Sequence, residues 1–148
     1  MKIKLFAVVL IAAFAALAAP TIPTYAEEAA VRRLGALTPE AALEYMKTEK
    51  NLVIVDMAAK RYFDREHFEG AVNIPIEELD REEEDELYAA LPKGRPVVLH
   101  CRLGMIVPGA YERLTELRPD IPEIAYIDGA PLFREYNEWL ANGAGERK

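Results

Sequence analysis

The sequence predicts an α/β fold in which a mostly parallel central sheet is flanked by helices. One observation is that short apolar runs rich in Val and Ile, such as "NLVIVDM" (51–57) and "RPVVLHC" (95–101), are typical of strands buried on both faces. Another is that segments of helical pattern separate these runs, an order that favours parallel pairing. The length of 148 residues indicates one domain with a single core.

A polar lead-in at 27–37 precedes the first predicted helix. In "LTPEAALEYMK", Thr38 is the expected N-cap and Pro39 occupies the first helical position, where a missing N–H costs no hydrogen bond. The next elements are expected to be a strand at 51–57, a short helix at 59–68 and a shorter extended segment at 70–76. In the short helix, Tyr62 and Phe63 should face inward.

The second half continues the alternation of helix and strand. An acidic helix is expected at 77–92, and its charge run at 81–86 should be solvated. Its Leu79, Leu87 and Leu91 should face the core. The remaining elements are a strand at 95–101, a helix at 106–117 that ends before Arg118-Pro119, a strand at 123–128 and a last helix at 130–141. In the last helix, Phe133 and Trp139 should face the core.

The chain opens with a pattern typical of a secretory signal peptide. Two lysines precede an uncharged apolar stretch at 5–19, Pro20 ends the stretch, and residues 24–26 fit a signal-peptidase site. The stretch is short for a membrane span, and an uncleaved N-terminal anchor is the alternative. We therefore expect residues 1–26 to be removed and the mature protein to lie in the bacterial periplasm without stable membrane association. The polar tail at 143–148 is expected to be disordered.

Charge narrows the range of partners. The formal net charge of −7 disfavours binding to nucleic acid or to anionic lipid. No His or Cys accompanies the acidic run at 81–86, so we expect no metal site there.

The chain contains one cysteine, Cys101, which therefore cannot form an internal disulfide. In an exported protein a leftover cysteine indicates an intermolecular partner or a reactive thiol, and a buried, inert cysteine is the alternative. Cys101 follows a predicted strand and precedes a predicted helix. Ligands in open α/β sheets bind outside the carboxyl ends of the strands, so this position favours a functional thiol.

Three phrases resemble the rhodanese-like sulfurtransferase family, in the family's order. In "VIVDMAAKRYFDREHFEGAVNIP", the strand-end Asp56 and His67 lie eleven residues apart, as in the family's first signature. "VVLHCRLG" is similar to the family's strand-to-loop phrase, with Cys101 in the nucleophile's place, and "IAYIDGAPLFREY" is similar to its closing phrase. The resemblance implies a rhodanese-like three-layer sandwich over 38–142, of the small periplasmic, phage-shock type.

The resemblance implies a sulfurtransferase whose catalytic residue is Cys101. Sulfur transfer requires a thiolate, and a tight loop followed by a helix N-terminus turns backbone N–H groups toward the sulfur and stabilises an anion there. Gly104 fits the close backbone approach of such a loop. Arg102 is expected to steer an anionic donor, with a solvent-facing charge as the alternative. The expected substrate-binding residues are those of the loop: Arg102, Leu103, Gly104, Met105 and Ile106.

The expected reaction has two steps and requires no metal or organic cofactor. Cys101 attacks the outer sulfur of thiosulfate or of a persulfide donor and becomes a persulfide, and a cyanide or thiol acceptor then removes that sulfur. The expected partners are therefore a small anionic sulfur donor and a thiophilic acceptor.

Three further residues are expected to support the site. Asp56 should accept backbone hydrogen bonds near the loop. His67 should hold the "EHFEGAVNIP" segment rather than transfer a proton, and His100 should have a core or hydrogen-bonding role at the strand end rather than a catalytic one.

The chain departs from the family pattern at several positions, and these leave a second class of function open. The family's loop Arg, five places after the Cys, is Ile106 here, and the Arg two places after the strand-end Asp is Ala58. Cys-based phosphatases need an Arg six places after the Cys, where this chain has Val107, so that activity is disfavoured. Because Met105 and Ile106 make the loop apolar, the alternative to an active sulfurtransferase is a catalytically weak binding or sulfur-carrier module.

Overall fold

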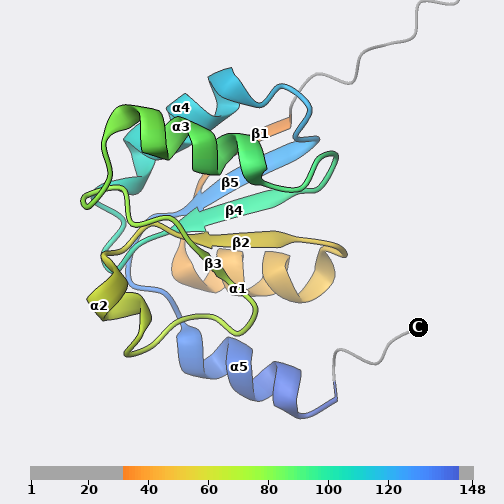
Figure 1. Ribbon diagram of the computed structural model, residues 1–148. Helices are drawn as coiled ribbons and strands as arrows, with labels where there is room; N and C mark the ends of the chain where they lie inside the picture. The colour runs from red at the N-terminus through yellow and green to blue at the C-terminus, as the bar shows by residue number, and fades with distance from the viewer. Residues whose placement is uncertain (1–31, 144–148) are drawn as a thin grey trace, which may run out of the picture.

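A computed structural model describes residues 32–143 (Figure 1), so the predicted signal peptide and, apart from Gly143, the predicted disordered tail lie outside the described residues. Its strands form a five-stranded sheet in the order β1-β5-β4-β2-β3, in which every pair is parallel. The strands are β1 (Arg32–Leu37), β2 (Val53–Asp56), β3 (Val72–Asn73), β4 (Val97–His100) and β5 (Glu123–Ile127). The helices are α1 (Pro39–Thr48), α2 (Lys60–Phe63), α3 (Arg81–Ala90), α4 (Val107–Leu117) and α5 (Phe133–Ala141).

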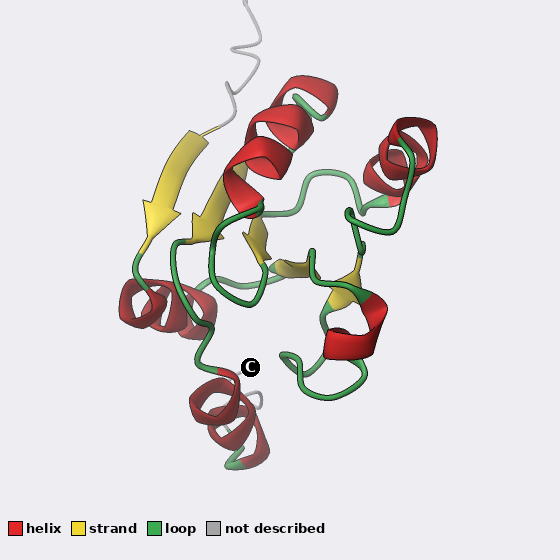
Figure 2. Ribbon diagram, turned by 90° about the vertical axis from the view of Figure 1, so that its left-hand side faces the viewer, coloured by secondary structure: helices red, strands yellow, loops and turns green. Residues whose placement is uncertain are grey.

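The three-layer arrangement predicted from the sequence is confirmed. Helices α3 and α4 cover one face of the sheet, and α1 and α5 cover the other (Figures 1 and 2). Successive strand residues point to opposite faces, so Val98 packs toward α1 and α5 while its neighbour Leu99 packs toward α3 and α4. Both faces are therefore apolar, which explains the continuous Val and Ile runs of the central strands.

Strand β1 is a difference from the sequence prediction, which assigned residues 27–37 to a polar lead-in. Arg32–Leu37 pairs in parallel with β5, with a register shift between Arg33 and Gly35. The segment contains no β-branched residue, and only Leu34 and Leu37 pack against the core. An edge strand of this kind gains its hydrogen bonds from one neighbour, so its local sequence carries little strand signal.

The predicted start of α1 is confirmed, and the predicted apolar face of the acidic helix is partly wrong. The Thr38 side chain accepts a hydrogen bond from the Ala41 amide at 3.2 Å, and Pro39 opens the helix. In α3, Leu87 is 38 % exposed, whereas Tyr88 beside it is fully buried. The Asp80 capping box fixes where α3 begins, and the packing of α3 on α4 decides which of its residues are buried.

The aromatic residues of α2 also differ from the prediction, because Tyr62 and Phe63 are only half-buried and do not belong to either core cluster. Helix α2 has four residues and lies at the end of the sheet to which the strand arrows point (Figure 1). It follows β2 directly in the chain, so its side chains are placed beside the carboxyl ends of the strands.

Candidate active site

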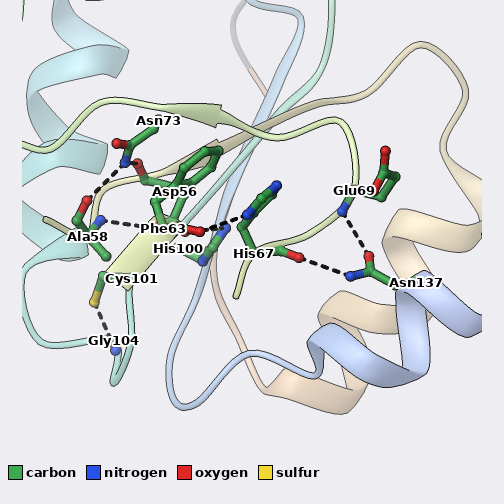
Figure 3. A network of polar contacts seen from close by, with 10 residues as sticks. All are labelled: Asp56, Ala58, Phe63, His67, Glu69, Asn73, His100, Cys101, Gly104 and Asn137. Carbon is green, nitrogen blue, oxygen red and sulfur yellow. Dashed lines mark hydrogen bonds and ion pairs between the residues drawn. The ribbon is translucent and has the colours of Figure 1, made fainter. Parts of the chain in front are cut away.

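Cys101 lies at the carboxyl edge of the sheet, directly after β4. The loop 101–106 then leads into α4, which begins at Val107. The Cys101 side chain is buried, and its Sγ accepts a hydrogen bond from the backbone N–H of Gly104 at 3.2 Å (Figure 3). The predicted inward turn of a backbone N–H toward the sulfur is therefore present.

Gly104 is the residue that allows this turn. Its φ of +79° lies in the left-handed region, and a Cβ at this position would lie 2.5 Å from the backbone nitrogen of Gly129. The predicted close approach is confirmed, and its partner is the backbone at Asp128 and Gly129, just after β5. The Cys101 loop is thus held against the loop that follows the neighbouring strand.

Two hollows meet at Cys101. The smaller has a volume of about 190 Å³ and is lined in part by Asp56, Arg65 and Phe133. The larger has a volume of about 300 Å³ and is lined in part by Arg61, Glu77 and the apolar loop side chains. Four residues line both hollows: Ala58, Tyr62, Cys101 and Arg102. The thiol can therefore be approached from two sides that differ in size and chemistry.

The predicted substrate-binding residues occupy different places around these hollows. Arg102 lines both, while Leu103, Met105 and Ile106 line the larger one alone. Gly104 is buried and lines neither hollow. Leu103 is 59 % exposed and Met105 is 80 % exposed, so the larger hollow has an apolar rim open to solvent.

Tyr62 and two arginines form a stack beside the thiol. The Cζ atom of Arg102 lies 4.0 Å from the centre of the Tyr62 ring, and the Cζ atom of Arg61 lies 4.4 Å from it. The positive charge of these arginines lowers the pKa of the Tyr62 phenol, with the hydrogen bond from Arg61 as the largest cause. Arg102 is thus an exposed residue that is held over an aromatic ring beside Cys101.

The sequence analysis missed Tyr62, Arg61 and Arg65 as site residues. A signal was present in the chain order, because "AKRYFDRE" follows Asp56 at once and must emerge at the same sheet edge as Cys101. Arg61 and Arg65 bring positive charge to an edge where Ala58 and Ile106 bring none.

Asp56 lies on the floor of the smaller hollow. It is 1 % exposed, and its Oδ1 accepts a hydrogen bond from the Ala58 amide at 2.8 Å, as predicted for this residue. Burial raises the pKa of the Asp56 carboxyl to about 6. Asn73 fastens the same turn by donating to the carbonyl oxygens of Asp56 and Ala58, each at 2.9 Å (Figure 3).

His100 is fully buried beneath the site. Its ring packs edge-on against Phe68 and Phe133, and neither ring nitrogen has a hydrogen-bond partner among the described residues. Burial lowers the pKa of His100 to about 3, so the ring is neutral near pH 7. The 3.9 Å contact between His100 Nε2 and Asp56 Oδ2 is therefore not an ion pair. His100 lines neither hollow, in agreement with a core role.

His67 holds the segment between α2 and β3. Its Nδ1 donates to the carbonyl oxygen of Phe63 at 2.7 Å, and its ring stacks on the Phe63 ring at a centroid distance of 4.0 Å. Asn137 of α5 donates to the His67 carbonyl at 2.9 Å and accepts from the Glu69 amide at 2.8 Å (Figure 3). His67 lines neither hollow, and these bonds fit the predicted holding role.

Within residues 32–143 no three His, Cys, Asp or Glu side chains come together in a way that could hold a metal ion. None of the helices in this range has the length and apolar composition needed to cross a bilayer.

Comparison with known proteins points to one family. The model of the rhodanese-like domain family matches residues 38–132, which is more than half of the chain. A rhodanese-related protein from Thermoplasma volcanium has a similar structure, with a TM-score of 0.50, 18 % identity, and coverage of 73 % of this chain and 92 % of that one. A protein from Anabaena sp. has a TM-score of 0.50, 19 % identity, and coverage of 72 % and 76 %.

A third similar structure is a single-domain sulfurtransferase from Saccharomyces cerevisiae, with a TM-score of 0.44, 18 % identity, and coverage of 77 % of this chain and 94 % of that one. At these identities the structures from Thermoplasma volcanium and Anabaena sp. show a common fold and no more. A search of curated protein sequences found no match to the chain.

Proposed function

The chain belongs to the rhodanese-like domain family, and from that premise we propose that it is a sulfurtransferase that works through a persulfide on Cys101. The proposed donor is thiosulfate or a persulfide, and the proposed acceptor is cyanide or a thiol. The observation that carries the proposal is the position of the Cys101 thiol, which receives a backbone N–H from Gly104 and lines two hollows at once.

The proposed reaction balances without a further reagent. The Cys101 thiolate attacks the outer sulfur of thiosulfate, the sulfur–sulfur bond of the donor breaks, and sulfite leaves with the electron pair. The product is a Cys101 persulfide anion. Cyanide or a thiolate then attacks the terminal sulfur, and the bond between that sulfur and Cys101 Sγ breaks. Cyanide leaves as thiocyanate, a thiolate leaves as a new persulfide, and the Cys101 thiolate is regenerated in either case.

Positive charge beside the smaller hollow supports an anionic donor. Arg65 and Arg102 line this hollow together with the acidic residues Asp56 and Glu66, and none of the ion pairs found within residues 32–143 involves either arginine. Their guanidinium groups are available to a sulfonate or thiosulfonate group. They supply positive charge at a site where positions 58 and 106, at which the family resemblance would put arginines, carry none.

A second candidate function is a sulfur-carrier or binding module with weak turnover. The observation in its favour is the exposed rim of Leu103 and Met105, which suits an apolar partner group better than a small anion. Formation of the persulfide without rapid discharge to small acceptors would favour this candidate.

The site of action is proposed on the leader pattern alone. We propose that residues 1–26 are cleaved and that the protein acts in the periplasm, with no nucleic-acid partner. N-terminal sequencing of protein isolated from the native host tests this, because a sequence that begins at Met1 would contradict cleavage.

The decisive experiment is intact-mass measurement of the purified protein after incubation with thiosulfate, and again after addition of cyanide. The expected result is the gain of one sulfur atom that maps to Cys101, followed by its loss as thiocyanate forms. The Cys101→Ser protein is the control and should gain no sulfur while keeping its fold. Failure of a free Cys101 thiol to take sulfur from thiosulfate or from a persulfide donor contradicts the proposed function.

A further inference from the structure

The two hollows at Cys101 differ in the ligands that they suit. Sites for organic ligands usually have volumes of about 300–1,000 Å³. The smaller hollow, at about 190 Å³, lies below this range, has room for a compact inorganic anion beside Arg65 and Arg102, and is also lined by Asp56 and Glu66. The larger hollow, at about 300 Å³, reaches the lower limit and suits a small organic molecule.

The lining of the larger hollow combines three chemistries. Leu103, Met105 and Ile106 form an apolar wall, Arg61 and Arg102 supply positive charge, and Glu77 supplies a negative charge. A simple anion gains nothing from the apolar wall, and Glu77 opposes the attraction of the two arginines. A ligand with an alkyl part and charges of both signs matches all three.

The two charges are available to a ligand. Glu77 takes part in none of the ion pairs or side-chain hydrogen bonds found within residues 32–143. Arg61 has one ion pair, a 3.9 Å contact with Glu78, and that contact is exposed to solvent. Glu77 is near enough to Arg61 to raise the pKa of the guanidinium, although less than Tyr62 does. The positive and negative groups therefore both line the larger hollow.

On the basis of the proposed function, we propose that the larger hollow is the acceptor site and that its acceptor is a small amphoteric thiol of the cysteine class. The carboxylate of the acceptor would pair with Arg61, its ammonium with Glu77, and its alkyl part would contact the side chains of Leu103 and Met105. Donor and acceptor would thus approach the sulfur of Cys101 from different hollows.

The transfer step follows from this placement. The acceptor thiol loses its proton to solvent, and the thiolate attacks the terminal sulfur of the Cys101 persulfide. The bond between Cys101 Sγ and that sulfur breaks, the acceptor leaves as its persulfide anion, and the Cys101 thiolate is restored. No oxidant or reductant is consumed.

The test uses full-length mature protein loaded with one sulfur by thiosulfate, or by a persulfide donor, and verified by intact mass. Single-turnover discharge is measured with four acceptors. Cysteine carries an ammonium and a carboxylate, cysteamine carries the ammonium alone, 3-mercaptopropionate carries the carboxylate alone, and 2-mercaptoethanol carries neither. Each acceptor is compared between wild type, Glu77→Gln and Arg61→Gln. The ratio for one acceptor between two proteins cancels the intrinsic reactivity of its thiol.

We expect Glu77→Gln to slow discharge to cysteine and cysteamine by about two- to fivefold, the size of an exposed ion pair, and to affect the other two acceptors less. Arg61→Gln should slow cysteine and 3-mercaptopropionate selectively. Both effects should shrink at high ionic strength. The exposed residues Glu86 and Arg81 lie outside the hollow, so Glu86→Gln and Arg81→Gln are matched controls that should show no selectivity.

The outcomes separate this inference from the proposed function. A persulfide that forms and discharges normally, with equal effects of each variant on all four acceptors, overturns the acceptor assignment and leaves the sulfurtransferase proposal standing. Failure to load sulfur from either donor overturns both.

Discussion

The two ends of helix α4 differ in how fully their polar groups are satisfied. At the carboxyl end, the buried Arg118 donates to the carbonyl oxygens of Tyr88 and Leu91 at 2.6 and 3.0 Å. The same guanidinium makes two hydrogen bonds to Asp120, of 2.6 and 2.7 Å. One side chain therefore ties the last turn of α4 to the end of α3.

The amino end of α4 lacks such a partner. Its N-cap residue, Ile106, offers no side-chain acceptor to the first turn. Beside it lie the Cys101 thiol, the solvent-exposed Met105, and His100 with two unpartnered ring nitrogens. Among the buried side chains of the described residues, His100 at this end of the helix has unpartnered polar atoms, and the other such atom is the Tyr45 hydroxyl in α1.

On the proposed function, the carboxyl end of α4 contributes to stability and the amino end contributes to reactivity. Buried polar groups in folded proteins are almost always paired, and His100 departs from that rule beneath the Cys101 site although it lines neither hollow. Changes at the Arg118 end should therefore affect unfolding and leave the reaction intact, while changes at the Cys101 end should do the reverse.

The largest stability effect is expected for Arg118→Met. It removes the donor to two carbonyl oxygens and leaves Asp120 without its partner, so the free energy of unfolding should fall by about 3 kcal/mol. Urea unfolding measures this, with the exposed Arg81→Met as the control. Sulfur loading per folded molecule should be unchanged. If Arg118→Met lost no more stability than Arg81→Met, the stabilising role assigned to Arg118 would be wrong.

The next effect is expected for Gly104→Ala, with Gly70→Ala as a matched control. Both glycines have a φ close to +80°, so alanine strains the backbone at each by about 1 kcal/mol. Only at Gly104 would the added Cβ collide, with the Gly129 backbone at 2.5 Å, whereas nothing lies within 4 Å at Gly70.

The collision should displace the Cys101 loop and slow sulfur transfer by about 100-fold, the cost of a displacement of the order of 1 Å at a reacting group. Gly70→Ala should keep its activity. Stopped-flow or steady-state rates with thiosulfate distinguish the two variants, and equal rates would mean that the loop does not need its contact with Gly129.

A third prediction concerns the pH dependence of stability. The pKa of Asp56 is raised to about 6 in the folded protein, from a reference of 3.8, so this group makes stability fall as pH rises from about 4 to 6. The pKa of His100 is lowered to about 3, from a reference of 6.5, so this group makes stability rise over the same interval. The two contributions oppose each other in the wild type.

Asp56→Asn removes one contribution and should make stability rise more steeply between pH 4 and pH 6, by up to about 1.4 kcal/mol per pH unit. Urea midpoints at a series of pH values measure the slope. The exposed Glu86→Gln serves as the control and should leave the slope as in the wild type. Parallel curves for Asp56→Asn and the wild type would contradict the assigned pKa shift.

The smallest effect is expected for Arg65→Gln. Because Arg65 is an exposed residue at the smaller hollow, its loss should raise the KM for thiosulfate by about two- to fivefold and leave kcat nearly unchanged. Steady-state kinetics with cyanide as acceptor measure both constants. An equal rise in KM for the remote Arg81→Gln would assign the effect to the general field of the protein.

Local signals in the sequence determined most of the fold and the position of the thiol. The Val and Ile runs predict strands buried on both faces because one strand residue after another meets an apolar layer. Thr38 and Pro39 predict the start of α1 because a cap acts within one turn. Cys101 and Gly104 are three residues apart, so the N–H to sulfur contact depends on the conformation of one short loop.

The tertiary structure decided what depends on residues that are distant in the chain. Strand β1 exists because β5 offers it an edge, and the sequence of β1 carries no strong propensity of its own. The burial of Tyr88 rather than Leu87 follows from where α3 packs on α4. The stack of Arg102 on Tyr62 and the contact of Asp56 with His100 each join segments about forty residues apart, and parallel pairing of β2 with β4 brings them to one edge. The number and kind of charges around the thiol were therefore set by the sheet order, because a sequence lists charged residues without showing which of them will be neighbours.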